Sequence, residues 1–255
     1  MKNPTHSIRR YAVFHTPYST NIFYPRNPWI VSWWSAAFPG FGHYMLGKYF
    51  SGFLLMVWEV LINSLAHLNH AIYFSMIGQA EAAKEVLNEE WMVVYITVYV
   101  FQIWDSHRRA VEYNHYFTLA YSEGLQMKLH YLSGLEINIL EKRKPHLAMF
   151  WSVLTPGLGH FYVNRVLAIF FNLGVWVFIS YFAGFYRALV NTILGKFAVI
   201  PTVVNPQWFL FIPSLYIFIT YDSYKTCKEC NKLFDYEQAK FLQKEYQSDS
   251  FKMPI

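Results

Sequence analysis

The chain has 255 residues, of which 55% are hydrophobic, 20% aromatic and 15% charged. A soluble domain carries about 25% charged residues, so this composition argues against a soluble protein and favours one with many positions at a bilayer interface. The formal net charge of +5 resides on basic residues beside apolar segments, which favours anionic lipid headgroups as partners and argues against nucleic acid.

A Pro-Gly-x-Gly-His motif occurs at residues 39–43 and again at residues 156–160. The same offset of 117 residues relates Trp91 to Trp208, Tyr99 to Tyr216, Asp105 to Asp222 and Asn114 to Asn231. One ungapped register therefore holds over residues 28–114 and 145–231. We predict a tandem duplication.

In chain order, residues 1–27 are expected to form an extended or interfacial arm. Pro28 then opens an apolar helix that Pro39-Gly40 ends. Eleven residues rise about 16 Å, half of a ~30 Å hydrocarbon core, so this helix is predicted to be a broken half-span. Two transmembrane helices are expected to follow, over residues 49–68 and 91–104.

Residues 115–144 are predicted to be a cytoplasmic linker, with amphipathic surface helices over 119–140. The second repeat then begins, and its half-span and two transmembrane helices are expected over 146–155, 166–185 and 208–221. Pro213 is expected to kink the last of these helices. Residues 232–255 form a polar cytoplasmic tail that is predicted to be helical at first. The fold class is thus an all-α membrane protein.

The distribution of basic residues predicts the topology. If each half-span enters and leaves on one side, the cytoplasmic face holds 18 of the 21 Lys and Arg residues, and the outer face holds only Lys84, Arg187 and Lys196. Full crossing by the half-spans would invert the second repeat and largely cancel this bias. We therefore expect both termini to be cytoplasmic.

The repeated turn has two interpretations. In the structural one, six residues simply permit a tight helix–helix turn that the histidine caps: Pro39, Gly40, Gly42, Pro156, Gly157 and Gly159. In the functional one, free amides at the start of the next helix attract an anion or lipid headgroup. His43 with Lys48, and His160 with Arg165, would then complete the site.

Asp105 and Asp222 each end a predicted span, where the helix dipole disfavours a carboxylate. A duplicated placement against this gradient predicts a partner, and we expect His43 beside Asp105 and His160 beside Asp222. Such a partner is expected to shift the histidine pKa upward. The alternative is a solvated acid that neighbouring basic residues balance.

Four polar residues fall within the predicted spans: Glu59, Asn63, Gln102 and Asn172. An intramembrane acid is costly, so Glu59 is a functional candidate. The simpler alternative is a protonated acid that is hydrogen-bonded between helices.

Residues 39–48 resemble the glycine-rich turn of TM2-type membrane domains. Residues 156–165 likewise resemble the Pro-Gly-x-Gly-Gln/His-x-Tyr turn of small bacterial multi-spanning membrane proteins. The resemblance covers about ten residues in each half, and TM2 turns carry an extra residue between the last glycine and the histidine. It implies a membrane turn and no reaction, and the chain as a whole is interpreted as a bacterial inner-membrane protein.

Cys227 and Cys230 form a Cys-x-x-Cys pair that supplies only half of a four-ligand zinc site. An incidental thiol pair, a metal site shared in a dimer and a redox role stay open. The sequence shows no catalytic motif of the hydrolase, zinc-protease or phosphate-binding-loop type, and no cofactor is expected.

Three classes of function follow. The leading interpretation is a non-enzymatic scaffold or accessory subunit that binds lipids, other membrane proteins or a second copy of the chain. A small transporter or channel is the alternative, because paired broken helices mark substrate sites in transporters. A membrane enzyme that acts on lipid headgroups through the His/Asp pairs is the second alternative.

Overall fold

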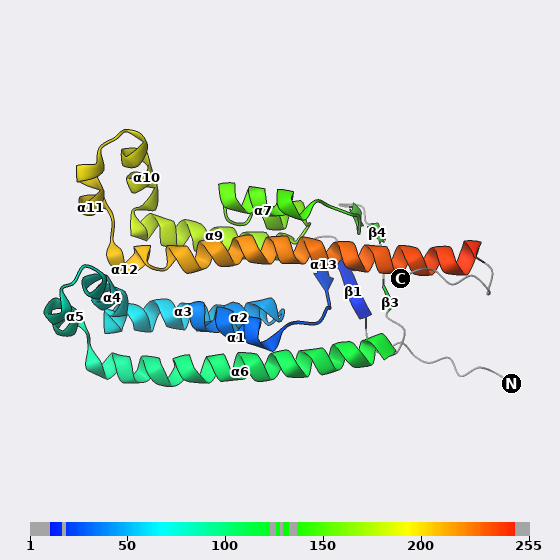
Figure 1. The fold of residues 1–255 in the computed structure, drawn as a ribbon, viewed down its shortest axis with the longest axis horizontal. Coiled ribbons are helices and arrows are strands. Elements are labelled where there is room, and N and C mark those ends of the chain that lie inside the picture. The colour runs from blue at the N-terminus through cyan, green and yellow to red at the C-terminus, as the bar shows by residue number, and fades with distance from the viewer. Residues whose placement is uncertain (1–10, 17–18, 123–125, 128–129, 133–136, 248–255) are drawn as a thin grey trace. The chain divides into compact units, whose positions relative to one another are not determined.

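The computed structural model describes residues 11–16, 19–122, 126–127, 130–132 and 137–247, and the statements below concern these residues. The predicted arm at 1–10 and 17–18 and the tail at 248–255 lie outside them. The fold is helical, as predicted (Figure 1). Its helices are α1 (Pro28–Ala37), α2 (Phe41–Met45), α3 (Tyr49–Ala66), α4 (Leu68–Met76), α5 (Ala80–Val86), α6 (Glu89–Ser122), α7 (Pro145–Leu154), α8 (Leu158–Tyr162), α9 (Val166–Ala183), α10 (Phe185–Ile193), η1 (Phe197–Val199), α11 (Ile200–Val203), α12 (Pro206–Phe209) and α13 (Ile212–Tyr246).

The short helix α1 begins and ends where its sequence predicts. The side chain of Asn27 accepts hydrogen bonds from the first free amides, and Pro28 occupies the first turn, where its missing N–H costs nothing. The helix ends at Phe38, and Gly40 then turns the chain with a φ of 98°. Helix α7 likewise has a proline, Pro145, in its first turn, although the side chain of Lys144 before it makes no capping bond. Each helix has 10 residues, which confirms the predicted short helices.

Helix bounds recur at the offset of 117 residues that relates the sequence motifs. The offset maps α1, α2, α3 and α4 onto α7, α8, α9 and α10. It also pairs residues with positive φ, including His67 at 53° with Gly184 at 70°. The backbone therefore repeats even where the residue type does not.

Chain segments before the helices and in the linker form strands. β1 (Tyr11–Thr16) pairs antiparallel with β2 (Ser19–Ile22) and parallel with β3 (Gln126–Met127). β4 (His130–Leu132) pairs antiparallel with β5 (Ile137–Ile139). The expected surface helices over 119–140 are therefore wrong beyond the end of α6. Tyr131 in β4 and the two isoleucines of β5 favour strands, and cross-strand pairing outweighs the helical periodicity.

The two longest helices extend well past the predicted spans. α6 has 34 residues and runs on from 91–104 as a single helix, and α13 has 35 (Figure 1). At the expected kink, a turn at Leu210–Phe211 separates α12, which ends at Phe209, from α13, which begins at Ile212. Pro213 thus lies in a first turn, where its ring and missing N–H are tolerated.

Two of the described helices, α3 and α9, are long and apolar enough to cross a membrane, with mean hydropathies of 1.5 and 2.1. A third candidate is a bent pair, Phe197–Val203 with Pro206–Tyr246, whose parts meet at 91°. The predicted spans at 91–104 and 208–221 lie in α6 and α13, where charged residues follow directly. Their membrane insertion stays a prediction.

The chain groups into two compact units, each built from separate segments. Unit 1 comprises Met1–Tyr24, Tyr116–Phe170 and Thr220–Ile255, and unit 2 comprises Pro25–His115 and Phe171–Ile219. Each is described by itself below. The predicted repeats follow sequence register and not these contacts, so their boundaries stay a prediction.

In unit 2 an aromatic stack covers the first turn. The rings of Phe41 and Phe218 lie 4.0 Å apart and nearly parallel, and Trp34 meets Phe218 edge to face at 5.1 Å. All three side chains are buried. In unit 1 the second turn packs on smaller side chains, since Ala148, Val163 and Cys227 form a buried cluster there. The turns share a backbone but differ in the side chains around them.

The second glycine of each motif lies where another element approaches closely. A Cβ on Gly42 would lie 2.2 Å from Ser35 Oγ and 3.1 Å from Ser106 Cβ. On Gly159 it would lie 2.2 Å from Ser152 Oγ and 2.9 Å from Ser223 Cβ. The short helix after each turn therefore fits between its half-helix and its long helix only when this residue has no side chain.

Gly42→Ala and Gly159→Ala are each expected to destabilise the fold by about 1–3 kcal/mol, because the added methyl overpacks a closed contact. Thermal unfolding in detergent measures the effect. Gly174→Ala is the matched control, since a Cβ there meets nothing within 4 Å and alanine favours a helix. Equal stability of Gly42→Ala and the control would show that the turn can open without cost.

Candidate functional site

The structure brings each motif histidine onto the predicted aspartate. In unit 2, His43 Nε2 on α2 lies 2.9 Å from Asp105 Oδ2 on α6. In unit 1, His160 Nε2 on α8 lies 3.0 Å from Asp222 Oδ2 on α13. None of the four residues is more than 4% exposed. The predicted proximity is confirmed in both units. The alternative is wrong in that both aspartates are buried, although neighbouring arginines do balance Asp105, as it also supposed.

Basic residues complete each pair, but from different elements. Arg108 Nη2 and Arg109 Nε, one turn further along α6, lie 2.8 Å and 2.5 Å from the Asp105 carboxylate. In unit 1, Arg165 precedes α9 and places Nη1 3.4 Å from Asp222 Oδ2 and 3.1 Å from Thr226 Oγ1. Each aspartate therefore has both a histidine and an arginine partner.

The sequence register shows that this difference is an exchange of positions. Thr226 occupies the register position of Arg109, and Arg165 occupies that of Lys48. Lys48 is exposed, whereas Arg165 is 8% exposed. The arginine beside Asp105 thus comes from the long helix α6, whereas the arginine beside Asp222 comes from the turn before α9. Each aspartate has an arginine partner in either case.

The protonation states follow from burial and charge. Burial lowers the pKa of His43 and of His160, and this effect exceeds the opposing influence of the aspartates. The expected upward shift of the histidine pKa is therefore wrong, because desolvation of the imidazolium outweighs its attraction to the carboxylate. Burial alone would raise the pKa of Asp105, but hydrogen bonds from His43, Arg109 and Arg108 hold it below its ordinary value. Each motif histidine is therefore a neutral imidazole, and that of His43 donates its Nε2–H to the ionised carboxylate of Asp105.

A second repeated contact was missed from the sequence. The Asn114 side chain accepts from Arg26 N at 2.8 Å and donates to Arg26 O at 2.6 Å. Asn231 bonds Arg143 in the same two ways, at 2.9 Å and 2.7 Å. Each asparagine fixes the backbone two residues before a half-helix. The match of Asn114 to Asn231 is visible in the sequence. Arg26 and Arg143 are related by the same offset of 117 residues, and this match could have identified the partners.

The polar residues of the predicted spans do not form one group. Gln102 Nε2 donates to the Ser35 carbonyl at 2.8 Å, and Asn172 Nδ2 donates to the Tyr44 hydroxyl at 3.1 Å. Asn63 Nδ2 donates to Glu59 Oε1 at 2.9 Å. Three residues that the sequence analysis did not single out extend this contact: Asn69, Tyr95 and Gln207.

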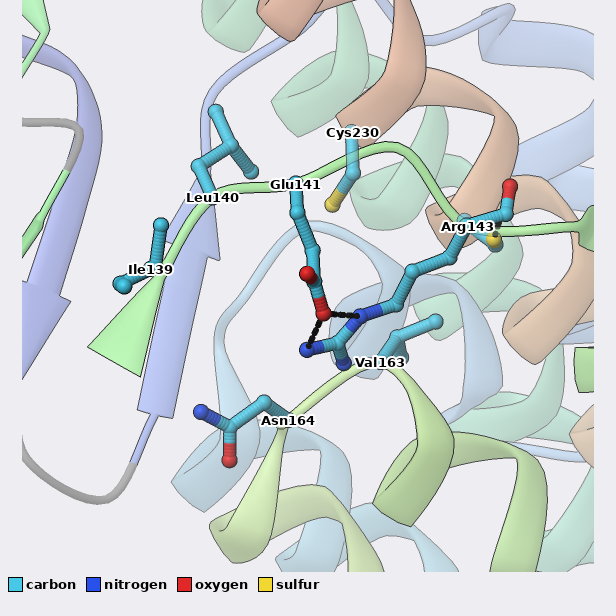
Figure 2. A pocket seen from close by; sticks show the side chains of 8 residues that line it. Ile139, Leu140, Glu141, Arg143, Val163, Asn164 and Cys230 are labelled. Carbon is cyan, nitrogen blue, oxygen red and sulfur yellow. Dashed lines mark hydrogen bonds and ion pairs between the residues drawn. The ribbon is translucent and has the colours of Figure 1, made fainter. Parts of the chain in front are cut away.

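The cysteine pair borders a cleft in unit 1 (Figure 2). Glu141 and Arg143 form an ion pair of 2.9 Å there. Burial raises the pKa of Cys227 to about 11 and that of Cys230 to about 12. In the part of the chain that the structure describes, no three His, Cys, Asp or Glu residues cluster as metal ligands. The three interpretations of the cysteine pair therefore stay predictions.

No family model, curated protein or solved structure matches this chain. The interpretation of the site therefore depends on its own geometry.

The buried histidines predict a stability that falls on acidification. A histidine whose pKa is lowered by folding favours the folded state fully above its ordinary value of 6.5, and this contribution is lost as the pH falls below that value. The unfolding temperature in detergent should therefore decrease between pH 7.5 and pH 5.5. His160→Gln should flatten this dependence, whereas the exposed His146→Gln should leave it unchanged. An equal slope in all three proteins would contradict the assignment of a neutral His160.

Proposed function

We propose that this chain is an integral membrane protein of two tandem repeats, and that it serves as a non-enzymatic scaffold or accessory subunit. Its apolar helix faces bind lipids or other membrane proteins. The proposed location is a bacterial inner membrane, with both termini and both turns on the cytoplasmic side. The resemblance of the turns to TM2-type domains is consistent with this proposal.

The exposed apolar surface of the candidate spans carries the proposal. Only 28% of α3 and 39% of α9 is buried inside the fold. Phe50, Leu61 and Phe170 are 75%, 57% and 74% exposed on these helices. Apolar surface of this extent needs a bilayer or a partner protein to cover it.

The burial and hydrogen bonding of the motif histidines support a non-enzymatic role. A general acid or base must reach its substrate within hydrogen-bond distance. The motif histidines are almost fully buried, and Nε2 of each is already bonded to an aspartate. The pairs thus stabilise the turns, whereas headgroup catalysis would require them to be exposed.

The transporter alternative is favoured by one observation, the contact of Glu59 with Asn63 inside unit 2. A site shared by all four polar span residues would favour it further, but Gln102 and Asn172 bond elsewhere. The scaffold interpretation therefore leads.

Cysteine labelling tests the membrane topology. In a Cys227→Ala, Cys230→Ala background, the exposed Lys48→Cys should be protected from a membrane-impermeant maleimide in intact cells, and Lys84→Cys should react. This follows from the 18-to-3 distribution of basic residues across the predicted faces. Labelling of position 48 from outside would rule out the half-span topology. Release of the chain by alkaline carbonate would rule out membrane integration.

Photo-cross-linking tests the scaffold role. A photoreactive residue in place of the exposed Phe50 is expected to form adducts with lipid or another membrane protein. The same residue in place of Met56, which is 4% exposed on the same helix, should cross-link only within the chain. Intramolecular products alone at position 50 would contradict the proposal.

A further inference from the structure

Glu59 has one carboxylate oxygen with partners and one without. Its Oε1 accepts from Asn63 Nδ2 at 2.9 Å and from the Tyr95 hydroxyl at 3.4 Å. Its Oε2 is buried and has no hydrogen-bond partner. The residue is 4% exposed in the middle of α3. A buried polar atom without a partner requires an explanation.

The surrounding amides are committed to one another. Asn63 Oδ1 accepts from Gln207 Nε2 at 2.7 Å and from Asn69 N at 3.2 Å. Asn69 Nδ2 donates to the Gln207 carbonyl at 2.7 Å. The network joins α3, α4 and α12 within unit 2, and α6 adds Tyr95. Its amide oxygens are therefore already occupied by internal donors.

No cation balances the carboxylate. Among the residues that the structure describes, no Lys, Arg or His forms an ion pair with Glu59. Tyr95 and Tyr99 on α6 interact electrostatically with Glu59, and two histidines lie near Asn69 in the chain: His70 on α4 and His67 just before that helix. An ionised Glu59 would thus be a buried charge without compensation.

The second repeat shows that this acid is not required to hold the helices together. Trp176 and Tyr186 occupy the register positions of Glu59 and Asn69, and Trp176 Nε1 donates to the Tyr186 hydroxyl at 2.9 Å. One neutral hydrogen bond therefore links α9 to α10, where the first repeat uses a carboxyl group and three amides. Unlike the Trp176–Tyr186 bond, the carboxyl group of Glu59 can ionise, and linking the helices does not require this.

We propose that the Glu59 carboxyl group is a proton-binding site. A metal ion would need several free oxygen ligands, but Oε2 is the only one that the network leaves. A proton needs one. Binding converts the carboxylate and a proton from water into the neutral acid, and release returns the proton to water. The ionised form then stands without compensation between α3 and α6, so release favours separation or hydration of these helices. The site lies apart from the repeated pairs and does not depend on the scaffold role.

Infrared difference spectroscopy of the full chain in lipid vesicles tests the proposal. At neutral pH the wild-type protein should show a carboxylic-acid carbonyl band that is absent from Glu59→Gln. The band should disappear on raising the pH and reappear on lowering it, as carboxylate bands change in the opposite direction. The exposed Glu85→Gln is the control and should retain the band.

Tyr95→Phe provides a second variant that keeps the carboxyl group. It removes the hydroxyl donor to Oε1, so the acid band should shift in frequency without disappearing. A wild-type protein with no acid band at neutral pH would overturn the proposal. Loss of the band when sodium is added at constant pH would also overturn it, because Oε2 would then bind a metal cation.

Discussion

Burial of a carboxyl group beside a tight turn is the constraint on which both halves of this protein depend. Asp105 and Asp222 are almost fully removed from solvent, and a charge in such a place is tolerated only when it is paired and hydrogen-bonded. A neutral imidazole and an arginine meet this requirement in each unit. The glycine before the histidine allows the short helix to approach closely enough for the contact. The turn, the glycine and the histidine therefore act together to bring a hydrogen-bond donor to the buried carboxyl group.

The arginine partner occupies different positions in the two units, which shows what stabilisation of the buried carboxyl group requires. Arg109 approaches Asp105 along its own helix, whereas Arg165 approaches Asp222 from the turn, where it also bonds Thr226. Coulombic attraction has no fixed direction, so either origin of the charge stabilises the carboxylate. The histidine bond is directional, and its geometry is kept within 0.1 Å in the two units, at 2.9 Å and 3.0 Å. The directional partner stays at its register position and the charged one does not.

Two kinds of buried polar group thus serve different roles. The His/Asp pairs recur, carry their own counter-charges and stabilise the turns. Glu59 occurs once and forms no ion pair with the residues that the structure describes, and Trp176, at the corresponding position 117 residues on, bonds Tyr186 instead. Because a neutral hydrogen bond links α9 to α10, an ionisable group is not needed for such a link. Glu59 therefore gives the first half of the chain a titratable site that the second half lacks at the corresponding position.

The sequence by itself determined the helical class, the short helices after Pro28 and Pro145 and the pairing of His43 with Asp105, because proline, glycine and the repeated register act locally or through symmetry. It did not determine the strands in the linker, since a strand forms only with a partner: β3 pairs with the distant β1, and β4 pairs with the neighbouring β5. The direction of the histidine pKa shift became clear only from the tertiary structure. The sequence shows the aspartate that raises this pKa, but not the burial that lowers it further. The tertiary structure also decided the partners of Glu59, because Gln207 and Tyr95 reach Asn63 and Glu59 through folding and not through spacing.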